Sequence, residues 1–211
     1  MLNGEITAAD RTKRKWAAAI SNATIPPVIA VFTFALINYS LSNGLSFVAL
    51  TFLTTLFAAI VPLGILIVWA RRTNVHDMDV PTRTDRNHPL LLAAVSYLVG
   101  TAVLLIIRAP LLSTAIMFGY FAGTFFLFFV NLRWKISIHT MGIAGPTTVL
   151  VFVFGYWGAL LGLLLPPVIW SRVYLKKHTV AQALAGAVVG FLLTAFALWL
   201  VLAYGPLDVL P

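Results

Sequence analysis

The sequence contains no cysteine and few charged residues. Without a thiol among its 211 residues, the chain cannot form disulfides, cysteine-ligated zinc or iron–sulfur sites, or a thiol nucleophile. Charged residues make up 9% of the chain and hydrophobic residues 61%, whereas a soluble globular domain has roughly 25% charged residues. Because so little charge cannot cover a surface in water, the apolar surface must face lipid. A water-soluble fold is therefore excluded.

Acidic residues are scarcer than basic ones, with 6 Asp and Glu against 14 Lys and Arg, which gives a formal net charge of +8. The basic residues form short clusters between long apolar runs. This distribution is typical of membrane topology rather than of a nucleic-acid-binding surface. We therefore expect membrane lipids, and no nucleic acid, among the partners of this protein.

Seven apolar runs are suited to crossing a hydrocarbon core of about 30 Å as helices. They cover residues 16–41, 47–70, 90–107, 111–132, 141–155, 156–170 and 181–204. The number of spans depends most on whether the chain turns at Gly155-Tyr156-Trp157-Gly158. A single helix over 141–170 would measure about 45 Å, which is longer than the hydrocarbon core. We predict a hairpin at the two glycines and about seven transmembrane helices, or six if this stretch is one span.

Charge segregation sets the orientation of these crossings. With seven spans, all but one of the 14 Lys and Arg residues fall on the N-terminal side of the membrane, and Arg108 is the exception. The positive-inside rule then places the N-terminus in the cytoplasm. We predict an all-α, polytopic membrane helix bundle with a basic cytoplasmic segment at 1–15 and a single integral membrane domain at 16–211. We expect it in the cytoplasmic membrane of a prokaryote.

All four histidines fall on the same basic side, and two loops there combine a histidine with residue types that bind phosphate. In the first loop, Ser137 and His139 precede small residues that open a helix, where free backbone N–H groups suit an anion. In the second, Arg172 supplies a guanidinium fork that suits paired oxygens. Gln182 follows His178 by one helical turn, where its amide oxygen can accept the ring N–H. The alternative is a helix cap with an interfacial histidine, beside basic side chains that bind lipid headgroups.

Both loops resemble motifs of the type 2 phosphatidic acid phosphatase superfamily. Residues 136–139, Ile-Ser-Ile-His, are similar to its Pro-Ser-Gly-His motif but lack the proline and the glycine. Residues 171–182 are similar to its Ser-Arg-x5-His-x3-Asp motif and keep its spacing throughout. The resemblance covers roughly residues 83–190.

The resemblance implies a role for each matching residue. Ser137 and Arg172 would bind phosphate, His139 would be the general acid, and His178 would be the nucleophile. Gln182 stands where the family has the aspartate that orients and supports the nucleophilic histidine. The predicted catalytic residues are therefore His178, His139 and Gln182. The predicted phosphate-binding residues are Arg172, Ser137, Arg83, Arg86, Lys135 and Ser171.

The remaining motif of that superfamily, Lys-x6-Arg-Pro, has its counterpart at residues 85–89, Asp-Arg-Asn-His-Pro. The proline is kept at a helix start, but His88 stands in place of the arginine and Pro81 in place of the lysine. Arg83 and Arg86 are the candidates for the missing cations. Two apparent spans separate this loop from the next motif, whereas familiar members often carry both in one loop.

These residues predict a lipid phosphatase or phosphotransferase that acts on a lipid phosphate or on an isoprenyl phosphate or diphosphate, with no metal or other cofactor. The main alternative is a non-catalytic relative that binds or transports anionic lipids, which the amide of Gln182 favours. A metalloenzyme built on the histidines with Asp77, Asp79 or Asp85 lacks the H-x-x-H or H-E-x-x-H spacing. An intramembrane prenyltransferase would need two aspartate-rich motifs.

Overall fold

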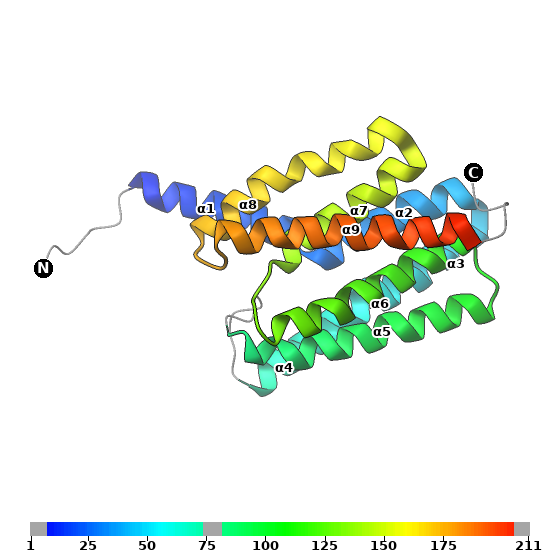
Figure 1. Ribbon diagram of the computed structural model, residues 1–211, viewed down its shortest axis with the longest axis horizontal. Coiled ribbons are helices and arrows are strands. Elements are labelled where there is room, and N and C mark those ends of the chain that lie inside the picture. Colours follow the sequence, from blue (N-terminus) through cyan, green and yellow to red (C-terminus); the bar gives the residue numbers. More distant parts are fainter. Residues whose placement is uncertain (1–7, 74–81, 205–211) are drawn as a thin grey trace, which may run out of the picture.

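The computed structural model of the protein describes residues 8–73 and 82–204, and the regular elements within these ranges are all helices (Figure 1). The α-helices are α1 (Ala8–Ala23), α2 (Pro26–Leu41), α3 (Gly44–Thr55), α4 (Val61–Arg72), α5 (Asn87–Ile106), α6 (Leu111–Asn131), α7 (Ile138–Phe154), α8 (Leu165–Tyr174) and α9 (Val180–Tyr204). A π-helical turn, η1 (Leu56–Ile60), joins α3 to α4, and two 3-10 segments, η2 (Thr84–Arg86) and η3 (Gly155–Leu164), precede α5 and α8.

Five helical stretches in the described part are long and apolar enough to cross a membrane. They are Gly44–Arg72, Thr84–Ile106, Leu111–Asn131, Ile138–Tyr174 and Val180–Leu200. The pair α1 and α2 is a sixth candidate, and it bends by 47° at the break between the helices. Pro26 and Pro27 open α2 at this break, because they have no N–H groups to continue a helix from α1. For the described residues, the prediction of an all-helical protein with several helices long and apolar enough to span a membrane is confirmed.

The chain reverses direction at Gly155, inside the longest of these stretches. Gly155 has φ +60°, a left-handed conformation that glycine adopts without strain. After the turn, Gly158 packs against the backbone of Leu150, and Gly162 packs against the side chain of Thr147. Residues later in the chain thus face residues earlier in α7, so η3 and α8 run back antiparallel to α7 (Figure 1). A hairpin was predicted at this position from the length of the apolar run.

A buried polar side chain ties three helices together inside the bundle. Asn38 of α2 donates from Nδ2 to the hydroxyl of Thr54 in α3 (3.1 Å), and Ser113 of α6 donates to Oδ1 of Asn38 (2.8 Å). All three side chains are fully buried. Hydrogen bonds of this kind hold membrane helices in register, because a polar side chain surrounded by lipid has no other group to bond with.

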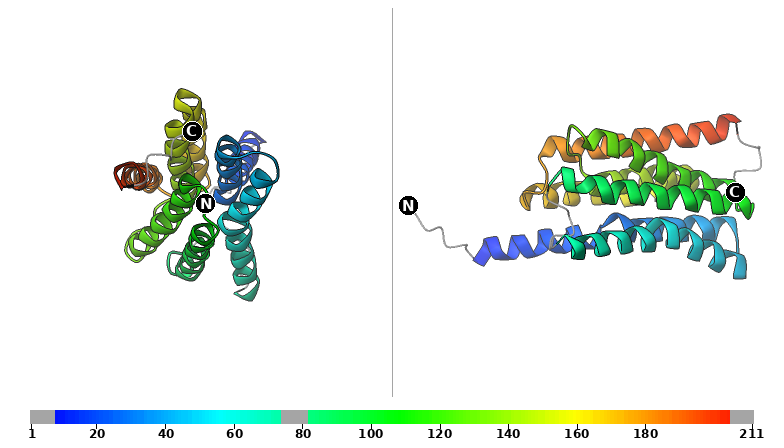
Figure 2. Two further views of the ribbon diagram at one scale, coloured as in Figure 1. Left: turned by 90° about the vertical axis from the view of Figure 1, so that its right-hand side faces the viewer. Right: turned by 90° about the horizontal axis from the view of Figure 1, so that it is seen from below.

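The helix ends gather at two ends of an elongated bundle (Figures 1 and 2). The turns α2–α3 and α5–α6 lie at one end, together with the hairpin after α7. The start of α5, the connection from α6 to α7 and the connection from α8 to α9 lie at the other end, next to α1. The predicted motif segments are therefore at one end of the bundle, and Arg108, in the turn after α5, is at the opposite end.

The close contact at the hairpin can be tested by adding one methyl group. A Cβ at position 158 would overlap the backbone of Leu150, which cannot move aside as a flexible side chain would. We expect Gly158→Ala to lower the stability of the protein by about 1–3 kcal/mol. Thermal unfolding of the purified protein in detergent measures this change. The matched control is Gly64→Ala in α4, where a Cβ meets nothing within 4 Å and the helix gains up to about 1 kcal/mol. Equal melting temperatures for Gly158→Ala and the wild type would contradict the packed hairpin.

Candidate functional site

Ser171 and Arg172 lie in the last turn of α8, and both side chains are completely buried. The five-residue connection to α9 then folds back over them. The backbone N–H groups of Lys177 and His178 both donate to the carbonyl oxygen of Arg172, at 3.0 and 3.2 Å, and Lys176 takes up φ +56°. This turn returns His178 to Arg172 and buries its ring, which is 6% exposed.

Three cations from separate parts of the chain act on the His178 ring. Burial is the largest cause that lowers its pKa, followed by the positive charges of Arg86, Arg172 and Lys135, and together they bring the pKa from 6.5 to about 3. Arg86 ends η2 immediately before α5, and Lys135 belongs to the connection between α6 and α7. The structure therefore brings together four of the residues that the sequence selected, and it holds the imidazole neutral at neutral pH.

The other predicted motif begins α7 and is fastened to the start of α9. Ser137 is the N-cap of α7, where its hydroxyl accepts from the N–H of Thr140, and its own N–H donates to the carbonyl of Gln182 at 3.1 Å. Thr140 also donates its hydroxyl to the carbonyl of Ala183 at 2.7 Å. Gly186 makes this approach possible, because a Cβ there would overlap the carbonyl of Ser137. The two motifs are thus joined at their helix starts.

His139 lies in the first turn of α7 and is 8% exposed. Its position places an imidazole beside the N-terminus of a 17-residue helix, as the sequence predicted. The role of His139 as general acid stays a prediction.

Gln182 takes part in a reciprocal cap at the start of α9. Its side-chain oxygen accepts from the N–H of Thr179 (3.1 Å), and the hydroxyl of Thr179 accepts from the N–H of Gln182 (3.2 Å), which is the capping-box arrangement. The Gln182 side chain also raises the pKa of His178, but burial and the three cations lower this pKa by more. Nδ1 of His178 is buried without a hydrogen-bond partner among the described residues. Orientation of His178 by Gln182 stays a prediction.

Helix α1 reaches the site through residues that the sequence analysis did not select. The hydroxyl of Ser171 donates to the carbonyl of Ala17 at 2.7 Å, and Nη1 of Arg172 donates to the hydroxyl of Ser21 at 2.5 Å. Ala17 and Ser21 are both buried and lie one helical turn apart. The Ser171 hydroxyl thus helps to dock α1 on α8, and its predicted contact with phosphate is untested. The only signal in the sequence was this pair of small residues on one helix face.

The two arginines proposed for the first motif have different surroundings. Arg86 is 4% exposed and acts on His178. Arg83 is partly exposed, and its guanidinium donates to the carbonyl of Leu132, while its own carbonyl accepts from Nδ2 of Asn131 at 2.7 Å. Arg83 therefore fastens this segment to the end of α6.

The alternative of a metal site combines the four histidines with Asp77, Asp79 or Asp85, and of these residues His76, Asp77 and Asp79 lie outside the described ranges. Within 8–73 and 82–204, no group of three or more His, Asp or Glu residues could hold a metal ion. His88 is exposed at the start of α5.

Comparisons with protein-family models, with curated proteins and with solved structures find no match to this chain. The geometry itself describes a buried neutral imidazole with three cations acting on it and a serine-capped helix start close by. Guanidinium and ammonium groups that converge from several directions suit an anion with several oxygens, such as a phosphate group.

The lowered pKa gives a direct test of this geometry. We expect the ring of His178 to stay neutral from pH 8 down to pH 5, because its pKa of about 3 lies below this window. NMR of protein with 15N-labelled histidine follows the ring nitrogens through the titration. Arg86→Gln and Lys135→Gln should each raise the pKa, since each removes a positive charge, whereas Arg83→Gln is the control from the same segment as Arg86. A wild-type midpoint near 6.5 would contradict the described site.

Proposed function

We propose that this protein is a membrane-embedded lipid phosphatase or phosphotransferase that acts on a lipid or isoprenyl phosphate or diphosphate. One observation carries the proposal. The positive charges of Arg86, Lys135 and Arg172, from three separate segments, all lower the pKa of the buried His178 ring. Phosphoryl transfer needs a nucleophile placed among cations that hold the phosphate oxygens. The resemblance of the two motif segments to the type 2 phosphatidic acid phosphatase superfamily supports the same function.

In the proposed reaction, a nitrogen of neutral His178 attacks phosphorus and the bond from phosphorus to the leaving oxygen breaks. The low pKa favours this step, because the ring keeps its lone pair at neutral pH. Arg172 binds two phosphate oxygens through its fork, and Lys135 and Arg86 offset the remaining charge. His139 donates a proton to the departing oxygen. Water then hydrolyses the phosphohistidine and releases phosphate, or an acceptor alcohol takes the phosphoryl group.

A second candidate is a protein that binds or moves anionic lipids without chemistry. The capping box of Gln182 and Thr179 favours it, because the amide oxygen is engaged at a helix cap and cannot stabilise a positive ring as a carboxylate would. The cations around His178 would then hold a headgroup that is released unchanged.

We propose seven crossings with the N-terminus in the cytoplasm, so that the cation-lined end of the bundle faces the cytoplasmic leaflet. The antiparallel hairpin at Gly155 and the grouping of the basic connections at one end of the bundle support this orientation. The positive-inside rule assigns such an end to the cytoplasm.

Single cysteines test the orientation in this cysteine-free chain. We expect cysteines at the exposed positions Thr73, Arg133 and Lys176 to react with an impermeant maleimide only after the cytoplasmic side is opened. A cysteine at the exposed position Arg108 should react in intact cells, which makes it the control. Labelling of Arg133→Cys or Lys176→Cys from outside would reverse the proposed orientation.

Phosphate release from a panel of lipid phosphates by the detergent-purified protein tests the function. We expect chelator-insensitive release by the wild type and a loss of at least about a thousandfold in His178→Ala, which lacks the nucleophile. Gln182→Asp should retain or raise the rate, because a carboxylate stabilises the positive ring. Lys176→Ala, whose side chain is exposed, is the control and should retain activity. Full activity in His178→Ala would refute the mechanism. Absence of release from both the wild type and Gln182→Asp would favour the binding protein.

A further inference from the structure

The first half of α1 carries a group of cations outside the packed bundle. Every residue from Ala8 to Trp16 is exposed, and α1 extends past the ends of α8 and α9 (Figures 1 and 2). Four of these exposed residues form a basic cluster: Arg11, Lys13, Arg14 and Lys15. The described part of this end of the bundle contains 13 Lys and Arg residues but only two acids, Asp10 and Asp85. The basic cluster therefore lies next to an end that is itself strongly positive, and charges of one sign repel.

Tryptophans mark the level of the membrane surface beside the basic cluster. Trp16 of α1 and Trp170 of α8 are both exposed. They lie at one level, because their neighbours in the chain, Ala17 and Ser171, are joined by a hydrogen bond. Exposed tryptophans at helix ends are typical of the headgroup level of a bilayer. The basic cluster precedes Trp16 by at most five residues, or about 7.5 Å along a helix, so it lies within reach of lipid headgroups.

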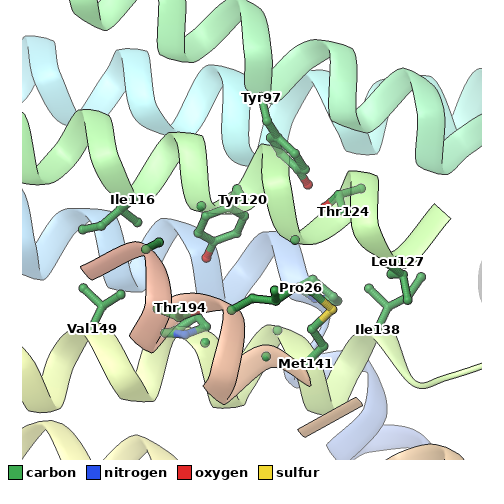
Figure 3. A pocket seen from close by; sticks show the side chains of 18 of the residues that line it. Pro26, Tyr97, Ile116, Tyr120, Thr124, Leu127, Ile138, Met141, Val149 and Thr194 are labelled. Atoms are coloured by element: carbon green, nitrogen blue, oxygen red, sulfur yellow. The ribbon is translucent and has the colours of Figure 1, made fainter. Parts of the chain in front are cut away.

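The break between α1 and α2 allows α1 to move alone. The two helices are bent by 47°, and Ile25 between them is extended, with φ −61° and ψ 142°. Pro26 begins α2 and packs on α7, since a Cβ added to Gly142 would lie 3.1 Å from the proline side chain. Figure 3 shows Pro26 inside the bundle, among the residues that line an internal cavity. Helix α2 is thus fixed to the bundle, and α1 can pivot at Ile25.

The position of α1 determines how Arg172 is held. Ser21 of α1 accepts from Nη1 of Arg172, whose side chain is completely buried. Nearer to the basic cluster, the hydroxyl of Tyr174 donates to the carbonyl of Asp10 at 3.4 Å. A pivot of α1 away from α8 would remove Ser21 from the guanidinium, and a buried charge that loses a partner costs free energy.

We propose that the basic cluster binds the headgroups of anionic phospholipids at the membrane surface, and that this binding keeps α1 docked on α8. The headgroups offset the repulsion between the basic cluster and the positive end of the bundle. Without them, α1 pivots at Ile25 and withdraws Ser21 from Arg172. Basic residues next to a spanning helix suit such a surface, where each one strengthens binding by roughly fivefold. This lipid site is separate from the cations that act on His178, and it does not depend on the reaction proposed above.

Two spin labels in the full-length chain measure the position of α1. They are attached to cysteines at the exposed positions Thr12 in α1 and Thr73 at the end of α4, and double electron–electron resonance gives the distances between them. We expect one narrow distribution in nanodiscs that contain phosphatidylglycerol and a broader one in phosphatidylcholine alone. Phosphatidylglycerol should raise the ratio of docked to undocked α1 at least about tenfold. Salt at about 1 M should abolish the difference, because the Debye length falls to about 3 Å.

Charge variants at exposed positions distinguish the basic cluster from the rest of the positive end. The double variant Lys13→Gln/Arg14→Gln removes half of the cluster and should reduce the response to phosphatidylglycerol at least about fivefold. The matched control is Arg71→Gln/Arg72→Gln, an exposed pair at the end of α4 with the same change in charge, which should respond as the wild type does. Soluble glycerol phosphate, added to phosphatidylcholine nanodiscs, should leave the distribution unchanged because it presents no charged surface.

Equal distributions in the two kinds of nanodisc would overturn the proposal, as would an equal response of Lys13→Gln/Arg14→Gln and the wild type. A response to glycerol phosphate as large as that to phosphatidylglycerol would assign the basic cluster to a soluble phosphate and also overturn it. Ser21→Ala tests the link to Arg172. It should lower the ratio of docked to undocked α1 about tenfold in phosphatidylglycerol nanodiscs, because a hydrogen bond to a charged group is lost, and an unchanged ratio would refute this link.

Discussion

A guanidinium group that is completely buried at the end of a membrane helix is the constraint on which the site depends. A buried charge must be compensated where water cannot reach it. Ser21 accepts from Nη1 of Arg172, which ties α1 to α8. The main-chain carbonyl of Arg172 accepts two N–H groups of the following turn, which folds this turn back over the helix end. The position of His178 is therefore a consequence of how Arg172 is buried.

The second half of the site depends on how closely two helix starts approach. Ser137 donates its N–H to the carbonyl of Gln182, and Thr140 donates to that of Ala183, so the free backbone groups of each helix start find partners on the other. Only glycine at position 186 leaves room for this contact. The same contact brings the segment of Ser137 and His139 to that of His178, although about 40 residues separate them in the chain.

The apolar runs and the turn at Gly155 could be predicted from the sequence, because hydrocarbon thickness and backbone chemistry restrict each of them locally. The grouping of Arg86, Lys135, Arg172 and His178 was expected from motif spacing and charge. The docking of Ser21 on Arg172 was not, since it joins residues 151 positions apart and small side chains carry no specific signal. Gln182 belongs to two patterns in the sequence, the capping box with Thr179 and the histidine motif with His178, and its spacing fits both.

The low pKa of His178 links the binding of phosphate to the binding of a proton. Burial and three cations hold the pKa at about 3, so the ring meets a ligand near neutral pH without a proton. A phosphate placed among the same cations opposes their effect and raises this pKa. By linkage, a proton on the ring strengthens the binding of the anion by the same factor. A neutral ring in the phosphate-bound state keeps a lone pair for attack on phosphorus, whereas a protonated ring is a fourth cation that only holds the headgroup. The protonation state of His178 with phosphate bound therefore separates catalysis from binding.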